Sequence, residues 1–127
     1  MITKTGAKLD IFAYSDYRLF LNAYINGRKS TTGKYSIRAW CQRLGFKSPA
    51  TLNMILRGHR DPGDEVLGKF HNYFRFNQEE RDYFECLVKL SKYKNNEARK
   101  FDVLEKIKHI NPNIHKFGEV DLALFSA

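Results

Sequence analysis

The side chains of this sequence that are best suited to binding chemistry are cations gathered in one stretch. Between Asp16 and Asp61 the chain has nine Lys or Arg residues and neither Asp nor Glu. Over all 127 residues, 22 Lys or Arg against 14 Asp or Glu give a formal net charge of +8. This distribution favours a polyanionic partner, and the alternative is a basic face that only meets solvent.

The residue types used in catalysis and metal binding are present without the spacing that such chemistry needs. The histidines, which lack the mutual ligand spacing of a zinc site, are His59, His71, His109 and His115. No Ser, His and Asp arrangement sits on a recognisable nucleophile turn. Cys41 and Cys86 are expected to be reduced apolar side chains, with a disulfide or a redox role as the alternative. We therefore expect no enzyme, no metal and no cofactor.

The hydropathy pattern argues against a membrane protein. The chain has no run of about 18 apolar residues, which a spanning helix would need. Residues 1–10 lack the apolar segment of a secretory signal. We expect a cytoplasmic protein that has no membrane partner.

Apolar residues recur at helical spacing along most of the chain, which predicts an all-α fold: a compact bundle of five to six helices. The predicted helices span about 16–28, 36–44, 48–57, 64–74, 77–94 and 97–110. Gly27 and the segment 30–33 are expected to end the first helix and form a loop. In the last helix, the residues expected to face the core are Phe101, Leu104 and Ile107.

Residues 36–60 predict two helices joined by a tight turn. Ser36 and Ser48 suit N-caps, and Pro49 suits a first helical position because its missing N–H would have no partner there. Gly45 occupies a position where a left-handed C-cap is expected, and Gly58 is expected to end the second of the two helices. The residues expected to bury the inside of the corner are Leu44, Phe46 and Leu52. Farther on, residues 77–80 resemble a capping box with Asn in the Ser/Thr place.

Three segments follow from this pattern. Residues 1–14 are expected to form an N-terminal arm, which either packs on the domain or moves freely. Residues 15–94 are expected to form the domain that contains the two-helix motif. Residues 95–127 would be a C-terminal helix and an apolar tail, and they could be the start of a truncated second domain.

The central stretch resembles the phage-repressor-like helix-turn-helix superfamily. The likeness includes Leu44-Gly45-Phe46 at the turn, Leu52 and Ile55 in the second helix, and the segment 57–62 after it. That segment, Arg-Gly-His-Arg-Asp-Pro, is similar to the family's Asn-Gly-Lys-Arg-x-Pro.

A closer likeness is to an uncharacterised bacterial family of transcriptional regulators. The shared motifs are Tyr-Arg-x-Phe-Leu at 17–21, Ser-x-Arg-Ala at 36–39, Gly-Phe-x-Ser-Pro at 45–49, Gly-x-Arg at 58–60 and Glu-x-x-Tyr-Phe at 80–84. The resemblance covers roughly residues 16–94. Members of that family usually continue into a further helical domain.

The resemblance implies a regulator, or its N-terminal domain, that binds double-stranded DNA with a recognition helix of about Ser48–Arg57 in the major groove. Base or phosphate contacts are expected from Ser48, Thr51 and Asn53. Phosphate contacts are expected from Lys47, Arg57, His59 and Arg60, and a supporting field from Lys34, Arg38 and Arg43. Pro49 and Ala50 replace the Gln or Arg that repressor-like helices often carry, and offer apolar contacts instead.

Other partners stay open at this stage. The alternative function is a protein-interaction module whose Pro49, Ala50 and Met54 face meets another protein. RNA is a third possible partner. Binding of single-stranded RNA requires exposed aromatic side chains on which bases stack, whereas most aromatic residues here have the spacing of core residues. A homodimer would suit a recognition helix that reads only a few base pairs.

Overall fold

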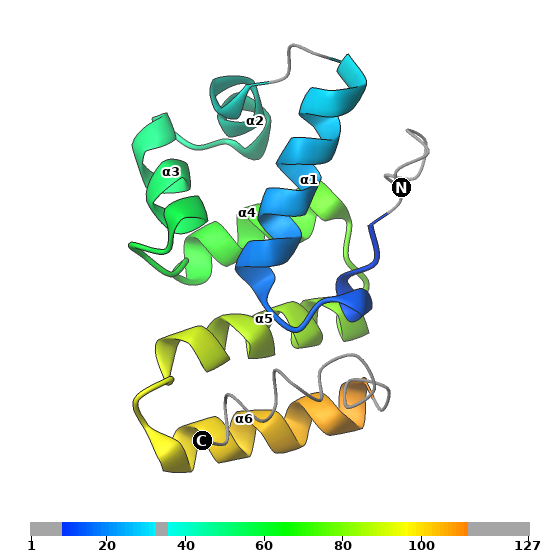
Figure 1. The fold of residues 1–127 in the computed structure, drawn as a ribbon, viewed down its shortest axis with the longest axis vertical. Helices are drawn as coiled ribbons and strands as arrows, with labels where there is room; N and C mark the ends of the chain where they lie inside the picture. The colour runs from blue at the N-terminus through cyan, green and yellow to red at the C-terminus, as the bar shows by residue number, and fades with distance from the viewer. Residues whose placement is uncertain (1–8, 33–35, 112–127) are drawn as a thin grey trace. The chain divides into compact units, whose positions relative to one another are not determined.

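The computed structural model describes residues 9–32 and 36–111, with only the backbone described for 29–32. These residues form one 3₁₀ helix, η2 (Ile11–Ala13), and six α-helices. The α-helices are α1 (Tyr17–Thr32), α2 (Ile37–Leu44), α3 (Pro49–Arg57), α4 (Asp64–Phe74), α5 (Gln78–Lys92) and α6 (Glu97–Ile110) (Figure 1). The described residues contain no strand, so the all-α prediction is confirmed. None of the described helices is long and apolar enough to span a bilayer.

The chain divides into two compact units. The first unit contains Arg18–Phe76, and thus α2, α3, α4 and nearly all of α1. The second unit contains Asp10–Tyr17 and the chain from Asn77 onward, and thus η2, α5 and α6. Helix α5 packs on α6 within the second unit.

Helix α1 is longer than the sequence predicts. It continues through Gly27 to Thr32, so the expected end near Arg28 is wrong. A glycine inside a helix costs only about 1 kcal/mol relative to alanine. The buried stripe on α1 stabilises more than that, because Phe20, Leu21 and Ile25 are each at most 2% exposed.

Helices α2 and α3 are joined by a short turn, and capping residues set where each helix begins or ends (Figure 1). The Ser36 hydroxyl accepts a hydrogen bond from the backbone N–H of Ala39 at 3.1 Å, as an N-cap does. Gly45 ends α2 with φ 90°, and Gly58 ends α3 with φ 87°. Both angles lie in the left-handed region that favours glycine. The predicted left-handed C-cap at Gly45 is therefore confirmed, and Gly58 ends its helix as predicted.

Aromatic rings fill the core of the first unit. Trp40 on α2 is fully buried, and its ring centroid lies 5.0 Å from that of Tyr24 on α1 and 6.2 Å from that of Phe70 on α4. The hydroxyls of Tyr24 and Tyr73 share a hydrogen bond, and both rings pack edge-on against Phe74. This cluster packs α1 and α4 against α2, and α2 in turn packs against α3.

The second unit is an antiparallel pair of helices, α5 and α6, with η2 packed against α5 (Figure 1). The Asn77 side chain accepts from the N–H of Glu80 at 2.9 Å, and the Glu80 carboxylate accepts from the N–H of Asn77 at 2.8 Å. The predicted capping box is therefore confirmed. Within the arm, Ile11 is buried and the Phe12 ring lies 5.1 Å from that of Tyr83, so residues 11–12 pack on the helices. Residues 1–8 and 112–127, including the apolar tail, lie outside the described residues.

One core prediction for α6 is wrong. Phe101 is 62% exposed, and the buried apolar residues of this helix are Val103 and Ile107. At about 100° per residue, Phe101 lies roughly 120° around the helix from Ile107, so the two cannot face the same neighbour. The i, i+4 pair Val103 and Ile107 sets the buried face instead.

Candidate nucleic-acid interface

Helix α3 buries one side and presents the other to solvent. Its buried residues are Leu52, Ile55 and Leu56. Its exposed residues follow one another at three- or four-residue intervals and are Ala50, Met54 and Arg57. Pro49, Thr51 and Asn53 are half-buried at the edge of this outer face. The helix thus leaves one continuous stripe that a partner can reach.

Exposed cations lie at both ends of α3. Lys47 precedes the helix, and Arg57 and Arg60 lie at its end and in the loop that follows, with the imidazole of His59 between them. Arg38 and Arg43 are exposed on the neighbouring α2. Lys34 lies outside the described residues. The basic residues that flank α3 therefore form two groups, which are separated by the length of the helix.

The start of α3 is suited to an anion. Ser48 occupies the N-cap position with extended backbone angles, but its side chain makes no capping hydrogen bond. This differs from the sequence expectation, in which its hydroxyl caps the helix. Pro49 follows in the first turn and has no N–H. The N–H groups of Ala50 and Thr51 have no acceptor within the helix, as at any helix start, and the helix dipole adds positive potential there.

The carboxylate nearest to this basic surface in sequence is neutralised by an internal cation. Asp61 follows Arg60 directly and pairs with Arg18 of α1 at 3.1 Å. The two side chains are only 23% and 22% exposed. Because the Asp61 charge is paired, it offsets little of the positive potential of the Arg57–Arg60 loop.

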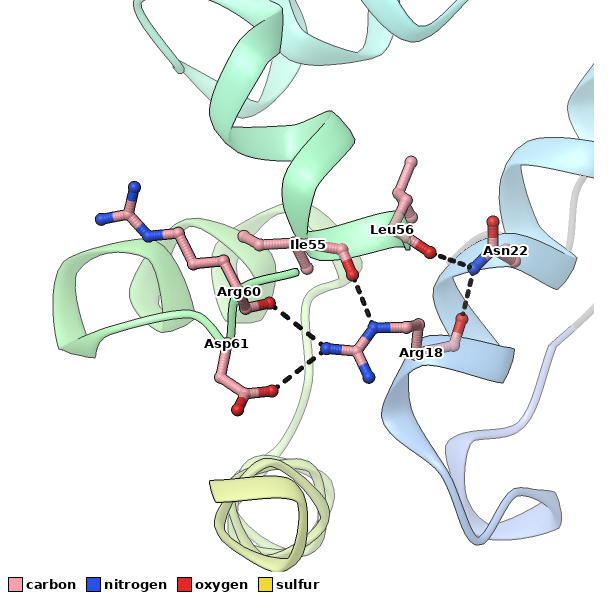
Figure 2. A network of polar contacts seen from close by, with 6 residues as sticks. All are labelled: Arg18, Asn22, Ile55, Leu56, Arg60 and Asp61. Atoms are coloured by element: carbon pink, nitrogen blue, oxygen red, sulfur yellow. Dashed lines mark hydrogen bonds and ion pairs between the residues drawn. The ribbon is translucent and has the colours of Figure 1, made fainter. Parts of the chain in front are cut away.

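Arg18 and Asn22 bind the C-terminal end of α3 to α1 (Figure 2). The Arg18 Nε donates to the carbonyl of Ile55 at 2.6 Å, and the Asn22 amide donates to the carbonyl of Leu56 at 3.2 Å. A second guanidinium nitrogen of Arg18 donates to the carbonyl of Arg60 at 3.2 Å. Sequence analysis counted Arg18 only among the basic residues. No local pattern could have indicated contacts to partners 37 to 43 residues away.

Two cations lie beside the glycines that end α2 and α3. A Cβ added at Gly58 would lie 3.8 Å from the Arg18 guanidinium, and one at Gly45 would lie 3.7 Å from the Lys69 ammonium. Lys69 belongs to α4 and lies beside the turn between α2 and α3. It is a second cation of this region that sequence spacing did not single out, because it is 24 residues from Gly45 in the chain.

The described residues show no arrangement suited to metal binding. No group of three or more His, Cys, Asp or Glu side chains within 9–32 and 36–111 could hold an ion. Cys41 and Cys86 are both buried and free. Burial raises the pKa of both thiols, although nearby cations (Arg38 for Cys41, Lys106 for Cys86) oppose the shift. Each thiol is therefore protonated at neutral pH and packs as an apolar group.

Part of the chain is similar to a known bacterial protein. The chain is 38% identical over 55 residues to the uncharacterised HTH-type transcriptional regulator YvzC of Bacillus subtilis (strain 168). The match covers 43% of this chain and 70% of the relative. No family model matches the chain, and no solved structure matches it.

Proposed function

Because this chain belongs to the HTH-type transcriptional regulators, we propose that it binds double-stranded DNA with α3 in the major groove. One observation carries the proposal: the outer face of α3 is exposed and has cations at both ends. Neither the fold nor the stability of the first unit requires cations to be gathered there. Their concentration is therefore best explained by a polyanionic partner.

The dimensions of α3 suit this role. A nine-residue helix is about 13 Å long, and the major groove of B-DNA is about 12 Å wide. A helix lying across the groove would bring Lys47 near one phosphate strand and the Arg57–Arg60 loop near the other. The N-terminal N–H groups of α3 would donate hydrogen bonds to a phosphate oxygen on the Lys47 side.

The side chains on α3 suggest modest base readout. Asn53 is able to read adenine with two hydrogen bonds, and Ser48 and Thr51 are able to reach bases or phosphates. Ala50, Pro49 and Met54 offer only apolar contact, for example to a thymine methyl group. We infer that phosphate contacts supply most of the affinity, and that DNA shape contributes to selectivity.

Four further features belong to this proposal. The fold of the first unit is of the phage-repressor-like type. The protein acts in the cytoplasm. The residues that bind DNA lie within 15–94. The chain binds DNA as a homodimer, since one recognition helix reads only a few base pairs.

The test is a double substitution at the C-terminal cation group. Arg57→Ala with Arg60→Ala removes two charges while leaving the Arg60 carbonyl that Arg18 binds. Binding of a fluorescent random-sequence duplex is followed by anisotropy at three salt concentrations. We expect affinity at 0.1 M salt to fall on the order of 50-fold, and the log–log salt slope to flatten by about 1.8, since each phosphate contact contributes about 0.9.

The matched control removes two charges elsewhere. Lys89 and Lys92 are exposed on α5 in the second unit, so Lys89→Ala with Lys92→Ala should leave the slope unchanged. If both double variants lower affinity equally, the contact surface is placed wrongly.

A protein-interaction module is the second candidate, favoured by the apolar residues on the outer face of α3. Met54 is 36% exposed and lies one turn after the exposed Ala50. This candidate predicts that the wild-type chain retains no duplex at any of the three salt concentrations.

A further inference from the structure

The end of α3 is held by groups that lie outside the helix. The last carbonyls of a helix have no N–H donors within the helix to bind. Here Gly58 donates its N–H to the carbonyl of Ile55 at 3.2 Å, and His59 donates to that of Met54 at 2.9 Å. Arg18 adds a shorter bond to the Ile55 carbonyl, at 2.6 Å, and brings its positive charge to the negative end of the helix dipole.

The same guanidinium also holds the loop that follows α3. One of its terminal nitrogens lies 3.2 Å from the Arg60 carbonyl and 3.1 Å from the Asp61 carboxylate. Figure 2 shows the Arg18 guanidinium between the end of α3 and this loop, with the Arg60 side chain directed away from it. The guanidinium therefore fixes the backbone from which the exposed Arg57, His59 and Arg60 side chains extend.

Asn22 provides a second attachment one turn farther along α1. Its amide nitrogen donates to the Leu56 carbonyl at 3.2 Å and to the Arg18 carbonyl at 3.0 Å. Residues 18 and 22 are four positions apart, so they lie on the same face of α1. Two neighbouring carbonyls of α3, those of Ile55 and Leu56, are thus bound by one face of α1.

We propose that Arg18, assisted by Asn22, is a positioning residue of the DNA interface, which sets the orientation of α3 and of the Arg57–Asp61 loop without touching DNA itself. This inference rests on the proposed function. The competing role is that of one more phosphate contact, which the position of Arg18 in the acid-free stretch would suggest. The two roles depend on different properties of the side chain: positioning needs the planar fork of donors, whereas a phosphate contact needs mainly the charge.

The charge-retaining substitution Arg18→Lys separates these roles. A lysine ammonium is a compact point charge and cannot reproduce the fork that binds the Ile55 and Arg60 carbonyls together. In the anisotropy assay with the random duplex, we expect Arg18→Lys to weaken binding about tenfold with the wild-type salt slope. Arg18→Gln should weaken binding at least as much, because it also leaves Asp61 without its cation. As a phosphate contact, Arg18→Lys would bind like the wild type and Arg18→Gln would flatten the slope by about 0.9. That pair of results would overturn the proposal.

An uncharged variant provides an independent measurement. Asn22→Ala removes the bond to the Leu56 carbonyl and changes no charge, so it cannot act by losing a phosphate contact. We expect a smaller loss of affinity, about threefold, with the slope unchanged. The matched control is Asn26→Ala, one turn farther along α1 at an exposed position, which should bind like the wild type. If the two Asn variants bind the duplex equally well, Asn22 has no positioning role.

Amide hydrogen exchange tests the positioning without DNA. A merely structural role of Arg18 would destabilise the whole first unit, and exchange at Gly45 and Gly58 would accelerate alike. Positioning predicts faster exchange at Gly58 and His59 only. Gly58 donates to the Ile55 carbonyl that Arg18 also binds, and His59 donates to the preceding carbonyl, that of Met54. Uniform acceleration in Arg18→Lys would overturn the proposal. A wild-type chain that binds no duplex would instead overturn the proposed function, and with it any role of Arg18 in binding, whatever the exchange pattern.

Discussion

The two compact units of this chain are both helical but differ in charge. Arg18–Phe76 contains eleven Lys or Arg and three Asp or Glu. Asp10–Tyr17 together with the chain from Asn77 onward contains nine Lys or Arg and eleven Asp or Glu. The positive excess of the protein therefore lies in the unit that includes α2 and α3. Similar helices need no such imbalance in order to fold, so the difference indicates a function specific to the first unit.

Charges are also used differently in the two units. On α6, Lys100 pairs with Glu97 at 3.5 Å and Lys108 pairs with Glu105 at 3.4 Å, one turn apart in each case. In the first unit, the ion pair between Arg18 and Asp61 spans 43 residues and is mostly buried. Local pairs of the first kind contribute only a few tenths of a kcal/mol. The long-range pair instead joins two elements and fixes their geometry.

The largest effect that would test this comparison comes from the core of the first unit. Trp40→Ala should lower the free energy of unfolding by about 3–5 kcal/mol, because it leaves a large cavity among Tyr24, Phe70 and Phe74. The measurement is urea denaturation followed by circular dichroism. The control is Phe101→Ala in the second unit, where the ring is 62% exposed and the expected change is within about 0.5 kcal/mol. Equal losses in the two variants would contradict the burial described here.

The next effect concerns how the helices end. The first unit ends α2 and α3 with left-handed glycines, whereas the described helix ends of the second unit, at Tyr93 and Asn111, have negative φ. Gly58→Ala should cost about 1–2 kcal/mol, because φ 87° is strained for any side chain. Gly63→Ala is the matched control, since its φ is −84° and no atom lies within 4 Å of an added Cβ. Thermal unfolding of both variants would show the difference, and a neutral Gly58→Ala would refute the left-handed cap.

The smallest expected effect is a loss of stability of the second unit at alkaline pH. Burial raises the pKa of Tyr83 to about 12, and its hydroxyl donates to the Tyr14 carbonyl at 2.5 Å. The folded state therefore favours the neutral phenol. Its contribution to stability is complete below the ordinary pKa of 10 and is lost as the pH rises from 10 to about 12. Urea denaturation at pH 9 and pH 11 should show a larger loss for the wild type than for Tyr83→Phe. Equal losses would mean that Tyr83 is not responsible.

Local signals in the sequence predicted the helix boundaries well where a capping residue decided them. The observed α4 and α6 have the predicted bounds, and Ser36, Gly45 and Gly58 cap the helices as expected. Where no strong cap was present, the prediction was wrong: α1 continues past Gly27. A single glycine only weakly favours the end of a helix, and burial of the other apolar residues of α1 contributes more to stability than Gly27 costs.

The buried face of a helix was predictable when one apolar stripe dominated. The stripe on α1 was predicted correctly, including Tyr17, Phe20 and Leu21, all of which are buried. On α6 two overlapping stripes competed, and periodicity alone could not choose between Phe101 and Val103. The choice depends on which stripe meets α5, and that is a property of the packed pair.

For the candidate interface, sequence by itself determined the acid-free run of cations, the glycine turn and the two helices on either side of it. These depend on residues within a few positions of one another, and local backbone and capping energies are sufficient to specify them. Only the tertiary structure decided that Arg18 is used internally, that Asp61 is paired, and that Lys69 lies beside the turn. Such assignments depend on side chains that are tens of residues apart in the chain, which only packing of α1 and α4 with the α2–α3 pair brings together.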